Sequence, residues 1–556
     1  MTEAPERPSV RRSRPDIGPF VPPHADGDKK LAGMVSEVLG FDRVGMKDGF
    51  LALGGDSLTA TLLAVRIQDG FGFAIDPSII FDSPDLAALA ATLERSGRGV
   101  EEDKSLTPTV QARPERIPLS SEQQILLWLH QMNDDKAGYN VARAMRIRGT
   151  IDPDLLRRAL TELLDRHEIL RTRLEVTESA PVQIVDPTAG ADLEIVDLRA
   201  APVEERERAA RRHAGLFVRR PFALDGDKLF RACLVRLAED EQVLALSMHH
   251  LVSDGGSLVL IFSELGALYA ALASRKALPR RPSLQYADYT LWQAAAYPRL
   301  EDRQVAFWSE YLAGVRETRW LKPAPEAKAR HYRLAGHAVS LSPDLTAKLR
   351  DLGRSEDVTI AMILFAANQI ILAKLCGAED MVGGMTFSRR TRPEFQDVPG
   401  PMIVTYPVRT PIRPDGTFRE LLHYVKATLL EAYRHLEIDG VAMARRMTAQ
   451  SWPMTNFNLV GDRSGPAKRF QESLRAFDPS LGVTDFPTPD AEGGVAPIDF
   501  SIELYEEADR ITGKILYGLD VFDADFITEI AAYFETLLNR AAVDPACRLA
   551  ELASRS

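Results

Sequence analysis

Cysteine is scarce in this sequence, and its three residues are spread along the chain. Cys233, Cys376 and Cys547 form no CxxC pair and no cluster with histidine, so neither a zinc site nor a disulfide framework is expected. The pattern is typical of reduced thiols in the cytoplasm. A chain of 556 residues is long enough to bury sizeable cores without such cross-links.

Long apolar runs are missing too. No uninterrupted apolar stretch reaches the roughly 20 residues that a membrane-spanning helix needs, and residues 1–15 lack the apolar centre of a secretory signal. Acids outnumber bases by 79 to 68, which gives a net charge of −11 and argues against nucleic acid as a partner. We therefore expect a cytoplasmic protein that binds neither a membrane nor nucleic acid.

The chain divides into a short helical part and a long mixed part. Residues 1–27, rich in Pro, Arg and Asp, are interpreted as a tail or linker. Helical spacing of apolar residues over 28–96 predicts a small bundle of three to four helices. Residues 97–115 lack such periodicity and are interpreted as an interdomain linker. The remainder exceeds one comfortable core, so two lobes are expected, over 116–285 and 286–556.

The long part alternates strands and helices. Residues 229–237 and 243–248 are apolar runs separated by a polar turn, which predicts two paired core strands. Apolar residues over 258–272 then recur at i, i+3, i+4 and i+7, which predicts an amphipathic helix. A mixed α/β architecture is the fold class that this order favours.

A first candidate site lies in residues 50–58, which read FLALGGDSL. The two glycines permit a tight turn, and Ser57 then begins a helix, where unpaired amides and the helix dipole favour a phosphodiester on its hydroxyl. An Asp-Ser pair before a helix is more often a simple N-cap, so capping is the alternative. A Gly-x-Ser-x-Gly hydrolase elbow is excluded because Thr59 stands at the second glycine.

A second candidate site lies in residues 248–257, MHHLVSDGGS, between the strand and the helix described above. An imidazole can take up a proton, release one or hold an amine at neutral pH. His249 and His250 point to opposite faces of a strand, so a shared metal is not expected and one of them packs. Asp254 is placed to brace the loop, and Gly255 lets the chain reverse. A lone histidine is more often structural, but this pattern arises by chance in about one chain per thousand.

The first string resembles the phosphopantetheine attachment motif of peptidyl carrier domains. The resemblance covers about residues 30–96, including Val38-Leu39-Gly40 upstream and Phe81-Asp82-Ser83-Pro84 downstream. It implies that 4'-phosphopantetheine is covalently attached to Ser57 by a separate phosphopantetheinyl transferase. Residues 28–95 hold ten acids and six bases, a mildly acidic surface that suits electrostatic docking.

The His-His-x-x-x-Asp-Gly string is the signature of condensation domains of nonribosomal peptide synthetases. Three further segments resemble motifs of that family, namely Ser120–Gln124, Arg166–Arg173 and Tyr286–Tyr289. The resemblance spans about 116–545. It implies a small all-α four-helix carrier bundle followed by an α/β condensation domain, whose two chloramphenicol-acetyltransferase-like lobes form a V with a tunnel between them.

The same resemblance assigns roles to residues. His250 faces the centre of the tunnel, and His249 packs beside it. Asp254 has a structural role and pairs with an arginine, for which Arg389 is the matching residue, with Arg390 next to it. Gly256 replaces a bulky aromatic residue that usually follows the Asp-Gly pair, which suggests extra space near the acceptor channel.

The function that follows is amide-bond formation between carrier-bound thioesters. The carrier holds an acyl or peptidyl donor, and the acceptor is an aminoacyl group on a downstream carrier. Expected partners are these two thioesters, an upstream adenylation domain, downstream adenylation and carrier domains, and the transferase. Two alternatives stay open, namely an epimerisation domain acting on the carrier-bound residue and a non-catalytic condensation-like recruitment platform. A cyclisation domain is disfavoured because such domains replace His249 with aspartate.

Overall fold

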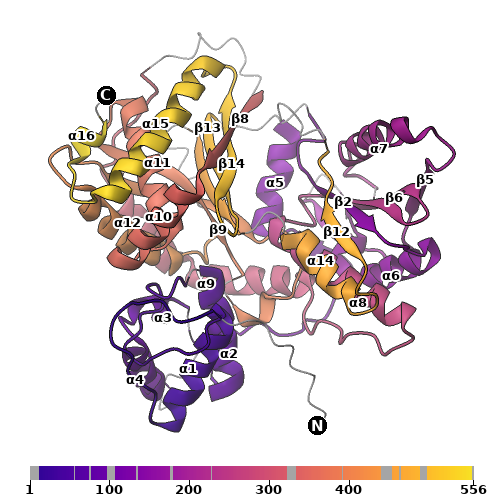
Figure 1. Cartoon of the computed structure of the whole chain (residues 1–556), viewed down its shortest axis with the longest axis horizontal. Coiled ribbons are helices and arrows are strands. Elements are labelled where there is room, and N and C mark those ends of the chain that lie inside the picture. The colour runs from indigo at the N-terminus through magenta and orange to yellow at the C-terminus, as the bar shows by residue number, and fades with distance from the viewer. Residues whose placement is uncertain are drawn as a thin grey trace.

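The computed structural model describes most of the chain and shows a small helical domain beside a much larger part built of two lobes (Figure 1). The described residues are 12–55, 57–73, 75, 77–96, 107–132, 135–175, 180–188, 190–226, 228–321, 333–390, 392–439, 454–461, 465–488 and 498–553. A four-helix bundle precedes a mixed α/β part that, within the described residues, has two large sheets, one small sheet and two large cores. The fold class predicted from the sequence is confirmed.

The helical domain packs around its own apolar core. Leu31, Val35, Leu63, Ile67 and Leu89 are all less than 2% exposed, so each helix contributes one apolar face, as the spacing predicts. The first helix ends at Gly40, whose left-handed backbone (φ 73°) closes the C-terminus. The helices are α1 (Asp26–Leu39), α2 (Ser57–Phe71), α3 (Ser78–Asp82) and α4 (Leu86–Ser96).

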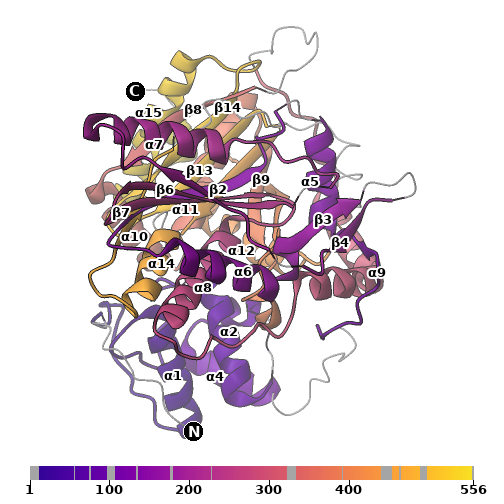
Figure 2. The same cartoon turned by 90° about the vertical axis from the view of Figure 1, so that its right-hand side faces the viewer.

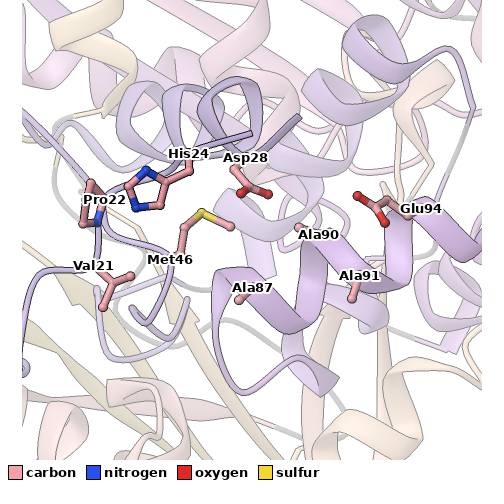
Figure 3. A pocket seen from close by; sticks show the side chains of 9 residues that line it. All are labelled: Val21, Pro22, His24, Asp28, Met46, Ala87, Ala90, Ala91 and Glu94. Atoms are coloured by element: carbon pink, nitrogen blue, oxygen red, sulfur yellow. The ribbon is translucent and has the colours of Figure 1, made fainter. Parts of the chain in front are cut away.

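The segment before α1 is packed onto this domain. Arg14 reaches the almost fully buried carboxylate of Asp48, which also accepts a hydrogen bond from the Gly45 amide at 2.8 Å. A cavity of about 280 Å³ lies between residues 21–24 of this segment and the exposed face of α4 (Figure 3). The described part of the predicted tail, from residue 12 onward, therefore belongs structurally to the helical domain.

The linker is fastened where it reaches the two-lobed part. The guanidinium of Arg113 grips both oxygens of Asp288, at 2.5 and 2.8 Å, and its Nε donates to Glu168. The Gln111 amide donates to the same Asp288 carboxylate at 2.7 Å. Asp288 is 1% exposed, so this end of the linker is held firmly, whereas residues 97–106 lie outside the described residues.

The N-terminal lobe is built on a five-stranded sheet with the order β12-β2-β7-β6-β5. Its two central strands form the antiparallel pair that the two apolar runs predict. Helices α6 and α8 cover one face and α7 the other. A small sheet, β1-β4-β3, lies beside it. The elements are β1 (Ile117–Pro118), α5 (Ser121–Met132), β2 (Asn140–Arg148), α6 (Pro153–Arg166), η2 (Glu168–Arg171), β3 (Thr172–Glu175), β4 (Val182–Val185), β5 (Leu193–Asp197), α7 (Val203–Val218), β6 (Phe230–Ala238), β7 (Glu241–His249) and α8 (Gly255–Ala273).

The C-terminal lobe is built on a six-stranded sheet with the order β10-β9-β11-β13-β14-β8. Helices α10, α11, α12 and α15 pack on one face of this sheet (Figure 1). Helix α9 contributes its first half to the core of one lobe and Trp308 to the core of the other. The elements are α9 (Tyr286–Tyr311), β8 (Leu334–Leu341), α10 (Pro343–Glu356), α11 (Ile360–Cys376), β9 (Asp380–Ser388), η3 (Pro393–Phe395), β10 (Ile403–Pro411), α12 (Phe418–Tyr433), β11 (Thr455–Val460), β13 (Phe500–Glu506), β14 (Ile511–Gly518), α15 (Ala524–Val543) and α16 (Leu549–Ala553).

One segment of the C-terminal half crosses to the other lobe. Helix α14 (Gly465–Arg475) packs on α8, and β12 (Gly482–Asp485) joins the N-terminal sheet beside β2. A clean division at residue 286 therefore does not describe the lobes, because residues 465–485 pack on the N-terminal one. The crossing segment ties the two lobes together.

Among the residues that the structure describes, α8 is the one single helix long and apolar enough to cross a membrane, and α10 with α11 would pass the same test only as a pair bent by 103°. It is sandwiched between α6 and α14 and also contacts β2, and residues such as Ile261, Phe262 and Leu265 are buried in the lobe core. Because α6, α14 and β2 all pack against α8, it is a core helix of the folded lobe. Its apolar composition is explained by this burial.

Candidate functional site

The loop before α2 is shaped by two glycines. Gly54 adopts φ +85°, which favours glycine. Gly55 lies so close to Phe50 that an added Cβ would approach the ring to 2.3 Å. Helix α2 begins at Ser57, as predicted, so the backbone there offers the free amides of a helix start. Asp56 and the side chain of Ser57 lie outside the described residues. The turn and the helix start fit a phosphodiester at this position.

His249 is the packed member of the histidine pair. Its ring is fully buried beside those of His130, Tyr139 and Phe222. Its Nδ1 accepts a hydrogen bond from the Leu251 amide at 3.1 Å. Burial, with two neighbouring histidines, lowers the pKa of His249 to about 3, so the ring is neutral at physiological pH.

That contact fixes the proton positions of two buried rings. Because Nδ1 of His249 accepts, its proton is on Nε2, which lies 3.1 Å from Nδ1 of His130. His130 must then accept at Nδ1 and carry its own proton on Nε2. Burial also lowers the pKa of His130. The chain from His130 through His249 to the Leu251 amide therefore holds the loop after β7.

His250 stands in the turn after β7 and is half-buried. Its amide donates to the Tyr139 carbonyl at 2.8 Å, which ties the turn to the start of β2. Its Nδ1 is enclosed and has no hydrogen-bond partner among the described residues. The exposed part of the ring therefore does not include Nδ1. Within the described ranges, no group of three metal-binding side chains is present.

Asp254 is completely buried and serves as the N-cap of α8. Its Oδ1 accepts from the amide and the hydroxyl of Ser257, at 2.8 and 2.7 Å. Its Oδ2 accepts from Arg390 at 2.8 Å and from the Met402 amide at 2.9 Å. Burial would raise the pKa of Asp254, but Arg390 and these hydrogen bonds outweigh it and hold the pKa below its usual value. Gly255 begins α8 and is exposed.

The arginine partner of Asp254 was assigned one residue too early. The structure pairs Asp254 with Arg390 and not with Arg389. Arg389 instead forms a buried ion pair with Glu122 of α5 at 2.6 Å and also donates to the Ser121 hydroxyl. Two successive arginines at the end of β9 thus hold two different acids of the N-terminal lobe. The resemblance alone could not decide between two adjacent arginines, and because both follow the end of β9 at Ser388, strand alternation does not set the direction of their side chains either.

Two glycines leave space around the ion pair between Arg390 and Asp254, which we call the Arg390–Asp254 clasp. Gly400 has φ +145°, and an added Cβ would lie 2.0 Å from the Tyr286 ring, while its carbonyl accepts from Arg390 at 2.8 Å. At Gly256 an added Cβ would lie 3.2 Å from Arg390 Nη1. The space expected beside Gly256 is therefore bounded by this guanidinium.

The carrier-like domain lies below the two-lobed part in both views (Figure 1, Figure 2), and its contacts are with elements of the C-terminal half. Helix α3 packs on α12 and α2 packs on η3. Asp82 accepts from Arg434 through both carboxylate oxygens, and the rings of Phe81 and Tyr433 meet edge to face at 6.4 Å. Leu430 of α12 packs into the core of the helical domain. The helix that begins at Ser57 thus lies beside η3, three residues beyond Arg390.

Sequence reasoning missed several side chains that shape this centre. Glu122 lies in a segment singled out for its resemblance, but no ion-pair role was predicted for it. His130 and Tyr139 act through contacts distant in sequence, and no role was predicted for Ser257, which lies within the second candidate site and bonds to Asp254 three residues before it. Glu122 stands in the polar first turn of α5, SEQQ, so no local signal in the sequence marks it as a buried acid that needs a partner.

Comparison with known proteins identifies both parts. The family model for the phosphopantetheine attachment site matches residues 29–93, and the condensation domain model matches residues 114–556. A linear gramicidin synthase from Brevibacillus parabrevis is 35% identical over 531 residues, which cover 94% of this chain and 10% of that protein. A plipastatin synthase from Bacillus subtilis is 29% identical over 542 residues, 96% of this chain and 20% of that protein. The chain thus spans about a tenth and a fifth of these relatives.

Solved structures of similar fold cover the two-lobed part. The X-domain from teicoplanin biosynthesis, in its complex with OxyB, is 25% identical with a TM-score of 0.68, over 81% of this chain and 98% of that one. The first condensation domain of the calcium-dependent antibiotic synthetase is 21% identical with a TM-score of 0.62, over 78% of this chain and 99% of that one. The latter likeness supports the fold alone.

Proposed function

Because the chain belongs to the nonribosomal peptide synthetases, as a phosphopantetheine-bearing carrier domain followed by a condensation domain, we propose that it is a donor carrier with its own condensing site. The acyl or peptidyl group on the Ser57 arm is passed to the α-amine of an aminoacyl group on a downstream carrier. The observation that supports this most strongly is the docked carrier, whose α2 lies on η3 beside the Arg390–Asp254 clasp.

Phosphopantetheine on Ser57 supplies the thiol that holds the donor acyl group as a thioester. The attacking amine forms a C–N bond to the thioester carbonyl as the C–S bond breaks, and the thiol is released. This exchange needs no ATP, so the barrier falls mainly through alignment of two tethered reactants. The protein therefore contributes mainly by holding the donor thioester and the acceptor amine in place.

His250 is the residue proposed to touch the reacting amine. Its backbone is fixed by the Tyr139 carbonyl, and the loop after it is fixed by His249 and by Asp254. With Nδ1 enclosed, Nε2 is the atom that accepts a hydrogen bond from the amine and takes up its proton as the amide forms. The remaining site residues position this ring.

The test is product formation with a loaded donor and a loaded acceptor carrier. We expect His250→Ala to lower amide formation by roughly a hundredfold or more while loading of Ser57 stays intact. His250→Gln keeps a hydrogen-bonding group but no basic nitrogen, so it separates holding the amine from taking its proton. Ser57→Ala should remove the mass increment of the arm. Full activity of His250→Ala would end the proposal.

Two other functions make different predictions in the same assay. A recruitment platform is favoured by the likeness to the X-domain solved with OxyB; it would bind a partner enzyme and form no amide. An epimerisation domain would change the configuration of the carrier-bound residue without an acceptor. Chirality analysis of the released residue and the acceptor requirement separate all three.

The proposed setting is a larger cytoplasmic assembly. All three cysteines are free, which suits a reducing compartment. An upstream adenylation domain would load the carrier, downstream adenylation and carrier domains would present the acceptor, and a phosphopantetheinyl transferase would attach the arm. The acyl, peptidyl and aminoacyl groups involved are to be identified by loading different pantetheine thioesters onto Ser57.

A further inference from the structure

Tyr433, the last residue of α12, has aromatic neighbours on both sides of the domain interface. Phe81 of the carrier lies 6.4 Å from it, and Phe387 of β9 lies 6.2 Å from it. Phe387 in turn meets Tyr406 at 6.1 Å. Rings thus run in continuous contact from the docked carrier to Tyr406, whose hydroxyl accepts from Arg389.

The backbone after Tyr433 makes a second connection to the same arginine. The Ile438 carbonyl accepts from Arg389 Nη2 at 2.6 Å, and the Leu436 carbonyl accepts from the Tyr406 hydroxyl at 2.8 Å. The carbonyl of His435, just before Leu436, accepts from the Trp308 indole at 3.0 Å. Residues 433–438, which we call the docking segment, therefore hold the buried Arg389 side chain in place.

Arg434 joins this segment to the carrier electrostatically. Its Nη2 donates hydrogen bonds to the Asp82 carboxylate, and its Nη1 donates to Glu431. Asp82 and Phe81 contact the outer side of the segment, so loss of the carrier leaves it with fewer restraints there. The inner side ends at Arg389, which is bonded to Glu122 of the other lobe.

We propose that the docking segment transmits carrier docking to Arg389, which joins the two lobes through Glu122. Contact of Phe81 and Asp82 with Tyr433 and Arg434 orders the segment, which in turn fixes Arg389 against Glu122. The proposal rests on the proposed donor role of the carrier and adds regulation to it. A docked carrier then does more than deliver its arm, because it also orders the buried ion pair between Arg389 and Glu122.

Hydrogen exchange at the end of β9, beside the docking segment, measures whether the segment is ordered. The Arg389 amide donates to the Met402 carbonyl, so its hydrogen-exchange rate reports the order of this end of β9. We expect Asp82→Lys to undock the carrier and to accelerate exchange over residues 386–390 and 433–438 by about tenfold. The charge swap Asp82→Arg with Arg434→Asp should restore protection.

A matched control on the carrier keeps the test specific. Glu37→Lys makes the same change of charge on the exposed Arg66 ion pair between α1 and α2, away from the interface, and should leave residues 386–390 unchanged. Release of the carrier is measured independently by small-angle scattering. The proposal is overturned if the carrier is released and exchange at residues 386–390 stays at the wild-type rate. It is also overturned if the carrier stays docked in both Asp82→Lys and Arg434→Glu.

Failure of the regulation and failure of the proposed function are distinguishable. In a Ser57→Ala background the carrier docks but bears no arm, so the exchange experiment runs without chemistry. Amide formation with the loaded wild-type chain is measured separately. Amide formation without any change in exchange would leave the donor role intact and remove the coupling alone.

Discussion

The Asp254–Arg390 clasp can be tested by removing the charge while keeping the shape. In Asp254→Asn the amide oxygen can still accept from Ser257, but the amide nitrogen then faces two donors, Arg390 and the Met402 amide. Arg390, whose side chain is 9% exposed, is left without an anion. Breaking a buried pair in this way costs about 3–5 kcal/mol, and the lower end applies because Arg390 keeps the Gly400 carbonyl.

The assay follows unfolding of the two-lobed part by tryptophan fluorescence. All five tryptophans lie between residues 128 and 452, so the signal excludes the carrier. Double-mutant cycles then compare Asp254→Asn combined with Arg390→Met against Asp254→Asn combined with Arg389→Met. We expect a coupling of about 2 kcal/mol for the first cycle and under about 0.5 kcal/mol for the second. A larger coupling to Arg389 would refute the pairing seen in the structure.

Three further outcomes follow from buried groups. His249 is neutral when folded because its pKa is about 3, whereas the unfolded chain protonates it near pH 6.5. The unfolding free energy therefore falls with acidification, by roughly 1.2 kcal/mol per pH unit near pH 5.5 from this group, and His249→Asn should flatten that slope in denaturant titrations. Gly55→Ala should lower the melting temperature of the carrier and slow arm attachment, since its Cβ would press on the Phe50 ring; unchanged values would contradict the turn geometry. Gly400→Ala should destabilise the two-lobed part by at least about 2 kcal/mol, because its Cβ meets the Tyr286 ring, and a neutral effect in the fluorescence assay would speak against that packing.

Local features of the fold could be predicted because they depend on the spacing of apolar residues, glycines and serines that are close in sequence. The two runs around residues 229–248 become β6 and β7, and the spacing over 258–272 becomes α8. The helix start at Ser57 and the C-cap at Gly40 follow from glycine placement and serine chemistry. Each of these depends on neighbours within a few residues.

Long-range features could not be read in this way. The crossing of residues 465–485 to the N-terminal lobe depends on β12 pairing with β2, more than 300 residues away in sequence, and no local spacing encodes that partner. The Arg389 and Arg390 assignments depend on backbone turns after the end of β9. The His130–His249 contact joins residues 119 apart. Such pairings are set by tertiary packing, which periodicity does not record.

The direction of acyl transfer tests the central claim most directly. The Ser57 arm is loaded with an isotopically labelled acyl group, a separate acceptor carrier is loaded with an unlabelled aminoacyl group, and both proteins are then weighed by mass spectrometry. The account predicts that the label moves to the acceptor carrier as an amide and that Ser57 retains a free thiol. Arrival of the aminoacyl group on the Ser57 arm, with the label still in place there, would contradict it.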